Sequence, residues 1–223
     1  MPISLAVPRG RLFEPVLELF AATGVPLVPE DQERRELVIE RDGWRFLMAR
    51  PRDVSLFVEH GLADFGVAGK EALLETPRDV VESLDLGIGR CRLALARPDG
   101  EPTELRRIRR IATKYPRLTE EYAARTGLTA QVLVMHGAVE SAATLGLADA
   151  IVDLVETGST LRANGLVVVD ILVESSARLI ANPVAYRLRS REVRAWTERL
   201  RQQVDQMRAA LELAQERQAV DGG

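Results

Sequence analysis

The chain has 223 residues and a net charge of −3 at pH 7, with 30 basic and 33 acidic residues. This length suits one large domain or two small ones, and the charge gives no reason to expect general binding to nucleic acid. No stretch is apolar for long enough to span a bilayer, and the start Met-Pro-Ile-Ser lacks the features of a signal peptide. The single cysteine, Cys91, cannot form an internal disulfide. We therefore expect a cytoplasmic protein that binds neither membranes nor nucleic acid.

In the first half of the chain, short apolar runs alternate with segments whose apolar residues recur every three or four positions. The runs are typical of buried strands and the other segments of helices. Pro51 suits the first turn of a helix that Gly61 closes. In chain order we expect a strand at 3–7, a helix at 12–23, strands at 37–39 and 45–49, a helix at 51–60, a strand at 64–68, a helix from Gly69 and a strand at 92–96.

The same alternation continues in the second half. Here we expect a strand at 108–113, a helix at 118–126, a strand at 130–135, a helix at 139–145, a strand ending near 155, a short helix and a strand at 166–173. From Ser190 onward the pattern predicts one long helix. Its apolar stripe, which we expect to pack against the body of the protein or a partner subunit, comprises Val193, Trp196, Leu200, Val204, Met207 and Leu211.

Strands that alternate with helices imply α/β units on largely parallel sheets. The spacing of the elements predicts two α/β lobes with a cleft between them. Ligands of such sheets bind outside the carboxyl ends of the strands. The loops at these ends are therefore the places to look for functional residues.

The segment 150–161 is the most informative of these loops. An apolar strand pattern ends in the acids Asp153 and Glu156, and Thr157, Gly158, Ser159 and Thr160 follow before a helix. Backbone N–H groups in a glycine-containing turn at the start of a helix attract phosphate, and the hydroxyls can donate to its oxygens. An acid just upstream can hold ribose hydroxyls. The order suits a sugar phosphate, although a plain loop with a hydroxyl N-cap is an alternative.

Cationic residues occupy other loops at predicted strand ends. Arg guanidinium groups match phosphate oxygens in bidentate fashion, and for each cation the alternative is an ordinary surface residue. Glu140, at the start of a helix, could accept hydrogen bonds from an amine or a hydroxyl. Two histidines and one cysteine offer no metal site. The cations in question are Arg9, Arg11, Arg50, Lys70 (after Gly69) and Lys114.

No nucleophile with an adjacent base is evident, and no Walker A sequence is present. A phosphate-rich ligand that meets many cations suits a transfer reaction driven by positioning and charge stabilisation.

Five segments, in order, resemble the ATP phosphoribosyltransferase family: 6–12, 51–61, 63–70, 112–116 and 149–166. This family joins ATP to phosphoribosyl pyrophosphate (PRPP) in the first step of histidine biosynthesis, with Mg²⁺ carried by the substrates. The resemblance implies two lobes of the periplasmic-binding-protein type II fold. Residues 1–90 with about 174–223 would form lobe I, including the C-terminal helix, and 91–173 would form lobe II, which carries the PRPP phosphate loop.

The resemblance also implies roles for particular residues. Arg11 would face the pyrophosphate, and Arg35 would help to stabilise the departing charge. Asp153 would lie near the ribose hydroxyls. The other PRPP ligands would be Arg9, Glu140, Glu156, Thr157, Gly158, Ser159 and Thr160, and the ligands of ATP or polyphosphate would be Arg50, Gly69, Lys70 and Lys114.

Two departures from the family pattern stand out. The family often has Lys where Arg9 stands, and Ser where Ala138 stands. The resemblance ends near residue 190, which leaves no room for a histidine-binding regulatory domain. We therefore expect the short form, a homodimer within a hetero-oligomer that includes a regulatory subunit resembling histidyl-tRNA synthetase. The alternatives are a non-enzymatic small-anion-binding protein of the same fold and a phosphoribosyltransferase for another base.

Overall fold

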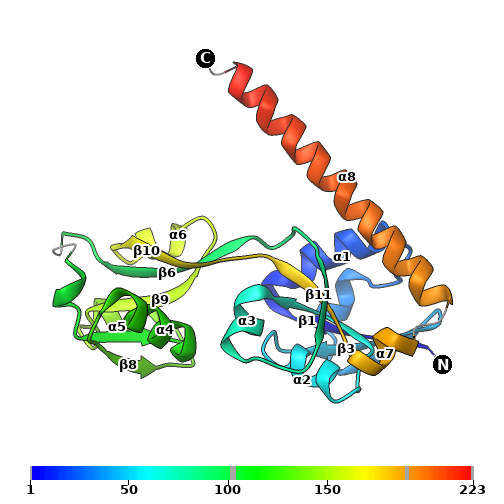
Figure 1. The fold of residues 1–223 in the computed structure, drawn as a ribbon, viewed down its shortest axis with the longest axis horizontal. Helices are drawn as coiled ribbons and strands as arrows, with labels where there is room; N and C mark the ends of the chain where they lie inside the picture. The colour runs from blue at the N-terminus through cyan, green and yellow to red at the C-terminus, as the bar shows by residue number, and fades with distance from the viewer. Residues whose placement is uncertain (1, 101–103, 189–190, 222–223) are drawn as a thin grey trace. The chain divides into compact units, whose positions relative to one another are not determined.

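The computed structural model describes residues 2–100, 104–188 and 191–221. The chain forms two compact units, each with its own β-sheet (Figure 1). Unit 1 comprises Met1–Leu73, Pro77–Gly89 and Ser176–Gly223, and unit 2 comprises Leu74–Thr76 and Arg90–Ser175. The predicted α/β fold is confirmed, but the two sheets are mixed and not largely parallel, because both contain antiparallel pairs. A cleft between the lobes stays a prediction.

The sheet of unit 1 has the strand order β2-β3-β1-β4-β11-β5. The central strand β1 pairs in parallel with β3 and β4, so the carboxyl ends of these three strands share one edge. β2 and β11 run antiparallel to their neighbours. The strands are β1 (Ile3–Pro8), β2 (Val38–Arg41), β3 (Trp44–Ala49), β4 (Phe65–Gly69), β5 (Val81–Asp85) and β11 (Ala177–Ala181).

Two α-helices of unit 1 begin later in the sequence than predicted. The helix expected at 12–23 opens as a 3₁₀ turn because Gly10 adopts φ +79°, and the α-helix begins only at Phe13. The helix expected from Pro51 begins at Val54, because the Asp53 N–H donates to the Arg50 carbonyl and closes a turn first. The elements are η1 (Gly10–Leu12), α1 (Phe13–Ala21), η2 (Pro29–Gln32), α2 (Val54–Glu59), α3 (Lys70–Glu75), α7 (Pro183–Leu188) and α8 (Arg191–Asp221).

The long C-terminal helix α8 packs on unit 1 through the first part of its predicted stripe. Trp196, which is 1% exposed, presents ring edges to Phe20, Trp44 and Phe65 at centroid distances of 5.8, 5.1 and 5.5 Å. Val193, Leu200 and Val204 join the same core, whereas Leu211 is exposed. Ser190, where the helix was expected to begin, lies outside the described residues.

The sheet of unit 2 has the strand order β10-β6-β9-β7-β8. β7, β8 and β9 are parallel, so their carboxyl ends also share one edge, while β6 runs antiparallel to β9 and β10. The strands are β6 (Cys91–Pro98), β7 (Arg110–Thr113), β8 (Gln131–Val134), β9 (Ala150–Val155) and β10 (Leu166–Ser175). The helical elements are η3 (Leu105–Arg107), α4 (Pro116–Thr126), α5 (Glu140–Thr144) and α6 (Ser159–Ala163).

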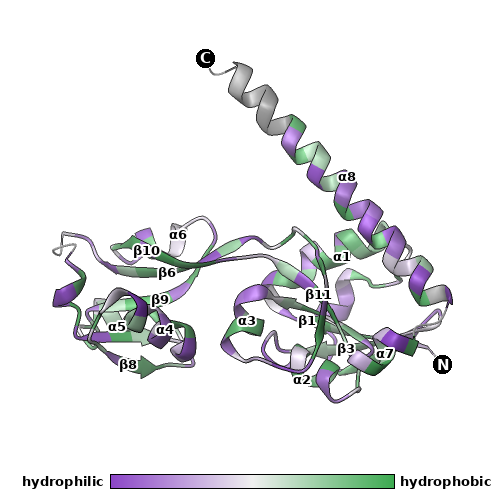
Figure 2. Ribbon diagram, viewed as in Figure 1, coloured by the Kyte–Doolittle hydropathy of each residue, from purple (hydrophilic) through white to green (hydrophobic). Residues whose placement is uncertain are grey.

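Each unit buries its own apolar core. The strands are mainly hydrophobic, whereas hydrophilic and hydrophobic residues alternate along α8 (Figure 2). Among the described residues, no helix combines the length and apolar character that a membrane span requires.

Candidate active site

The cationic loops of unit 1 gather at the shared carboxyl edge of its parallel strands. Pro8 pairs with Ala49 at the ends of β1 and β3, and the Arg9 N–H donates to the Ala49 carbonyl at 2.9 Å. Arg50 and Lys70 follow the ends of β3 and β4 directly. This edge is where α/β sheets bind ligands, so the fold brings these predicted residues to one region.

Arg11 is held at this edge by two partners. Its Nη1 donates to the Gly89 carbonyl at 3.0 Å, and its Nη2 lies 3.9 Å from the Glu71 carboxylate. The Glu71 side chain is 6% exposed and that of Arg11 is 29% exposed. Glycine at position 69 leaves room for this carboxylate, because a Cβ there would overlap it. The sequence analysis missed Glu71, although an acid directly after a rare lysine was the available signal.

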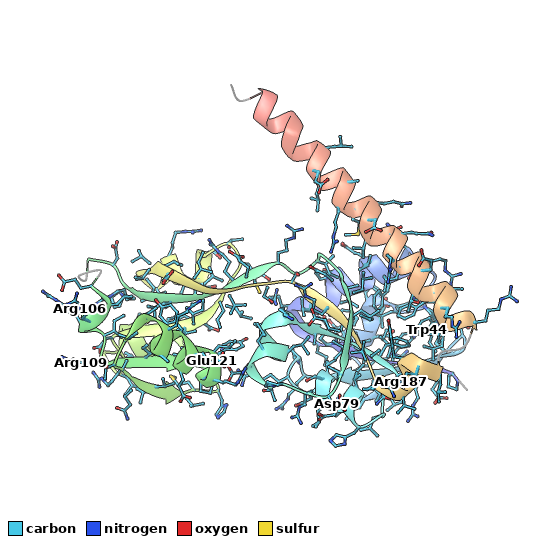
Figure 3. The ribbon with its side chains drawn as sticks, viewed as in Figure 1. Trp44, Asp79, Arg106, Arg109, Glu121 and Arg187 are labelled. Carbon is cyan, nitrogen blue, oxygen red and sulfur yellow. The ribbon has the colours of Figure 1, made fainter. Side chains whose placement is uncertain are left out.

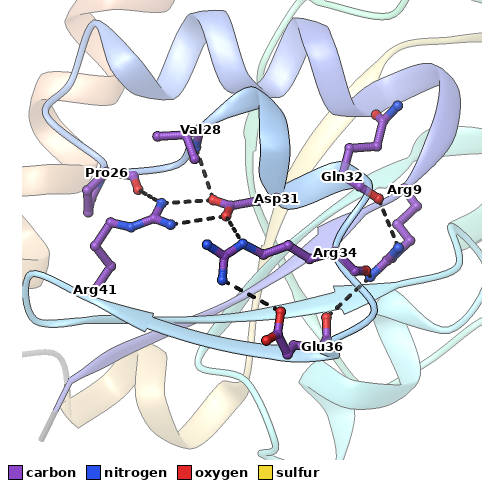
Figure 4. Close-up of polar contacts among 8 residues, drawn as sticks. All are labelled: Arg9, Pro26, Val28, Asp31, Gln32, Arg34, Glu36 and Arg41. Carbon is purple, nitrogen blue, oxygen red and sulfur yellow. Dashed lines mark hydrogen bonds and ion pairs between the residues drawn. The ribbon is translucent and has the colours of Figure 1, made fainter.

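Arg9, directly after β1, contacts the loop between η2 and β2 that contains Arg35 (Figure 4 shows the Arg9 contacts). The Arg9 guanidinium donates to the carbonyls of Gln32 (2.9 Å), Arg34 (2.7 Å) and Glu36 (3.3 Å). Its contact with PRPP stays a prediction. The Arg35 side chain is exposed, and among the described residues it makes no hydrogen bond or ion pair.

A buried carboxylate anchors the other end of this loop. Asp31 is fully buried and accepts from both Nη atoms of Arg41, at 2.9 and 3.1 Å, and from the Val28 N–H at 3.1 Å. Burial by itself would raise the pKa of Asp31. The hydrogen bonds from Arg41 and Val28, with the charges of Arg41 and Arg34, hold that pKa below its ordinary value.

Lys70 is part of an ion network on unit 1. Its Nζ lies 2.6 Å from Glu82, which is also 3.5 Å from Arg178. Arg178 in turn lies 2.6 Å from Asp85. Burial would raise the pKa of Asp85, but the Gly87 N–H, the Ser176 hydroxyl and nearby arginines hold it below its ordinary value. Lys70 therefore has a carboxylate partner before any substrate arrives.

In unit 2, the segment that the sequence predicts to bind phosphate lies between β9 and α6. Gly158 adopts φ +73°, a left-handed conformation that favours glycine. The hydroxyls of Thr157 and Ser159 lie 3.0 Å apart and both residues are exposed, as is Thr160. Arg162, which the sequence analysis missed, donates to the Thr157 carbonyl at 3.0 Å and so braces the loop.

Lys114 lies beside the acid that precedes this loop. Its Nζ is 3.3 Å from Asp153 Oδ2, and Asp153 Oδ1 accepts from the Leu154 N–H at 2.8 Å. The buried Thr113 hydroxyl donates to the Val152 carbonyl and accepts from the Tyr115 N–H, which fixes the backbone on both sides of Lys114. Lys114 was expected near polyphosphate, and in the structure it meets the residue expected at the ribose.

The remaining predicted residues make fewer contacts. Glu140 is partly buried at the start of α5, and Arg50 is exposed. Within the described ranges, no three His, Cys, Asp or Glu side chains lie close enough to hold a metal ion. Arginine is not confined to the candidate site, because Arg106 and Arg109 lie near η3, before β7 begins (Figure 3).

The family model for ATP phosphoribosyltransferase (HisG) matches residues 50–202. This chain belongs to the ATP phosphoribosyltransferase family. A relative of that name from Sorangium cellulosum (strain So ce56) is 45% identical over 202 residues, which cover 90% of this chain and 95% of the relative. The predicted activity is confirmed: the enzyme transfers the phosphoribosyl group of PRPP to ATP in the first step of histidine biosynthesis. The family match excludes both alternatives.

Solved structures support the same assignment. The ATP phosphoribosyl transferase (HisG:HisZ) complex from Thermotoga maritima contains a chain that matches with a TM-score of 0.78 and 32% identity, covering 92% of this chain and 99% of that one. The periplasmic aliphatic sulphonate binding protein SsuA from Escherichia coli matches with a TM-score of 0.59 over 95% of this chain and 71% of that chain. At 11% identity, this second likeness shows the fold alone. The periplasmic-binding-protein type II prediction is confirmed.

Proposed function

We propose that the loop from Glu156 to Thr160 binds the 5′-phosphate of PRPP. Its exposed hydroxyls and the open turn at Gly158 support this role, because a phosphate accepts hydrogen bonds from hydroxyls and from backbone N–H groups that converge on it. Arg162 holds the backbone of the loop in place through the Thr157 carbonyl. A loop fixed before binding loses less entropy when the ligand arrives.

Asp153 is proposed to accept hydrogen bonds from the ribose hydroxyls. Its carboxylate is 12% exposed and lies 3.3 Å from the Lys114 ammonium, which fixes its position. An acceptor-only group is the natural partner for two neighbouring hydroxyls. Lys114 is 31% exposed and is proposed to lie near a polyphosphate group of the substrates.

Arg11 and Arg35 are proposed to stabilise the pyrophosphate as it leaves. Arg11 follows β1 at the carboxyl edge of the parallel strands of unit 1, where its side chain is 29% exposed, and Arg35 carries an exposed guanidinium. Arg50, Lys70 and the backbone at Gly69 lie at the same edge and suit the polyphosphate of ATP. Glu140 suits a hydroxyl of PRPP or the amine of adenine.

The mechanism proposed is in-line substitution at the anomeric carbon. The lone pair of adenine N1 forms the new N–C bond, while the bond from that carbon to the pyrophosphate oxygen breaks and its electron pair leaves with pyrophosphate. N1 of neutral adenine carries no proton, so no general base is required. The cations act on the charge that grows on the leaving group, a form of preorganised stabilisation worth about 10²-fold in rate per donor.

Mg²⁺ is proposed to enter with the substrates, bound to the phosphates of ATP and PRPP. Mg²⁺ prefers to keep several waters and to bind through one or two carboxylates plus substrate phosphates. Asp153 in β9 and Glu156 directly after it are the carboxylates nearest to the proposed phosphate loop in the sequence.

The enzyme is proposed to work in the cytoplasm as a short-form catalytic subunit. Its expected assembly is a homodimer within a hetero-oligomer that also contains a regulatory subunit resembling histidyl-tRNA synthetase. The likeness to a chain of the Thermotoga maritima HisG:HisZ complex supports such a partner. The exposed side chains of Leu211 and Leu213 on α8 offer it apolar surface.

The test is to mix the purified chain with ATP, PRPP and Mg²⁺, with and without the partner subunit, and to follow phosphoribosyl-ATP by absorbance. We expect product that depends on both substrates. Folded protein that forms no product under either condition would contradict the proposal. Product formed only when the partner subunit is present would show that activity requires the assembled complex.

A further inference from the structure

Arg9 is predicted from the sequence to bind PRPP, yet its guanidinium already has partners within the chain. It donates to three backbone carbonyls, through Nη1 to Gln32 and through Nη2 to Arg34 and Glu36. Bidentate binding of phosphate needs a fork of two neighbouring N–H groups. Both Nη atoms of Arg9 are engaged, so a phosphate could take that fork only by displacing the carbonyls.

Two of the three carbonyls that Arg9 contacts flank Arg35 in the sequence. Those of Arg34 and Glu36 belong to the residues immediately before and after Arg35, at 2.7 and 3.3 Å from Arg9 Nη2. A single nitrogen therefore bridges the backbone on both sides of Arg35. Figure 4 shows the Arg9 side chain reaching this segment beside Gln32 and Glu36.

The neighbouring arginine is fixed in a different way. Arg34 Nε lies 3.4 Å from the buried Asp31 carboxylate, and its Nη1 lies 3.6 Å from Glu36. Asp31 is itself held by Arg41. Among the described residues, the Arg35 side chain has no such partner and is exposed. The segment 31–36 is thus tied down at both ends, and the one guanidinium left for a ligand is that of Arg35.

We infer that Arg9 is a positioning residue that clamps the segment around Arg35 and so presents the Arg35 guanidinium to the substrate. This inference rests on the role proposed above for Arg35 in stabilising the departing pyrophosphate. The guanidinium of Arg9 suits the task because its planar fork satisfies several acceptors at once. Lysine, which the family often has here, offers a single point charge and holds the segment less firmly.

The first test measures how readily the segment 31–36 opens and does not depend on enzyme activity. Trypsin cleaves after Arg34 and Arg35 once the segment opens, and mass spectrometry identifies these cuts. We expect Arg9→Met to raise the cleavage rate at these bonds by roughly tenfold, as expected when local opening becomes easier. Arg45→Met, which removes a surface ion pair with Glu40 on the same sheet, is the matched control and should leave the rate unchanged. An unchanged rate in folded Arg9→Met would overturn the inference.

The second test is a double-mutant cycle in the assembled enzyme. We expect Arg9→Met to lower kcat by about tenfold with the KM for PRPP nearly unchanged, and to lose most of this effect when Arg35→Ala is already present. An increase in the KM for PRPP in both backgrounds would instead make Arg9 a direct ligand and overturn the inference. Arg9→Lys, with an intermediate effect expected, serves if Arg9→Met does not fold.

Different results would contradict the proposed role of Arg35 at the pyrophosphate and the inferred role of Arg9 in positioning it. If Arg35→Ala keeps full turnover, the pyrophosphate role of Arg35 is wrong, and the cleavage rates alone decide whether Arg9 clamps the segment. If Arg35→Ala is slow but Arg9→Met leaves both cleavage and kcat unchanged, Arg35 keeps its role and the clamp is wrong.

Discussion

Lys114 Nζ lies 3.3 Å from Asp153 Oδ2 and joins two strand ends that are 39 residues apart in the sequence. The contact links the cation after β7 to the acid in β9, on parallel neighbouring strands. It places a fixed charge next to the carboxylate proposed to bind the ribose of PRPP.

Lys114→Met should therefore weaken PRPP binding. Without the ammonium, the Asp153 carboxylate loses its partner and its orientation, and kcat/KM for PRPP should fall by about tenfold. Asp153→Asn should lower it as well, and the double variant should cost less than the sum of the two, since residues in contact couple. Arg107→Met, which removes an exposed pair with Glu104 on the same unit, is the control. Additive effects of Lys114→Met and Asp153→Asn on kcat/KM would contradict an interaction between the two side chains.

The phosphate loop can be tested with a pair of glycines. Gly158 and Gly165 both have positive φ, +73° and +65°, so alanine should strain the backbone at either by about 1 kcal/mol. A Cβ on Gly158 would also lie 3.0 Å from Arg162 Nη1, whereas none of the described atoms lies within 4 Å at Gly165. Gly158→Ala should raise the KM for PRPP, and Gly165→Ala should change only the melting temperature. Equal KM values for PRPP in the two variants would argue against phosphate binding by the loop from Glu156 to Thr160.

The lowered pKa of Asp31 predicts an acid sensitivity of unit 1. The carboxyl titrates at its ordinary value of 3.8 when unfolded and below that value when folded. Its contribution to stability is therefore complete above pH 3.8 and is lost as the pH falls through the folded pKa. Asp31→Asn should reduce the free energy of unfolding by about 2 kcal/mol at pH 7, because the half-buried Arg41 loses its charged partner.

Denaturant titrations at several pH values check this prediction. The difference in unfolding free energy between the wild type and Asp31→Asn should shrink as the pH drops below 3.8. A difference that stays constant with pH would show that the carboxylate charge is not what stabilises the loop.

Trp196 should anchor α8 to unit 1. It is buried among Phe20, Trp44 and Phe65, and Trp196→Ala should cost about 3–5 kcal/mol through the cavity it leaves. Leu211→Ala, at an exposed position on the same helix, should cost little. Thermal unfolding of the two variants compares them. A small effect of Trp196→Ala would mean that α8 does not depend on this contact.

Much of the fold could be predicted because its strands and helices carry strong periodic patterns, as in Ile3–Pro8 and Ala150–Val155. β5 and β11 were missed. Val81–Asp85 has a weak, half-exposed pattern, and it forms a strand because β11 pairs with it and with β4. Local periodicity does not predict such pairing between distant segments.

The residue types of the site could be predicted from the loops at strand ends, but their partners could not. The ligand contacts expected of Lys114 and Arg9 stay predictions, and the structure adds contacts that the sequence did not predict, with Asp153 and with the carbonyls on either side of Arg35. These contacts depend on side-chain directions across segments 39 and about 25 residues apart. Glu71 and Arg162 were missed for the same reason, since each acts on a residue that the sequence did select.

The measurement that tests the central claim most directly is single-turnover formation of phosphoribosyl-ATP by the assembled enzyme, wild type against Arg11→Ala. Arg11 stands at the carboxyl edge of the parallel strands of unit 1, held by Gly89 and Glu71, and is proposed to meet the charge on departing pyrophosphate. We predict product from both proteins, with the variant slower by about 10²-fold at saturating PRPP. Rates that agree within a few-fold would contradict the account.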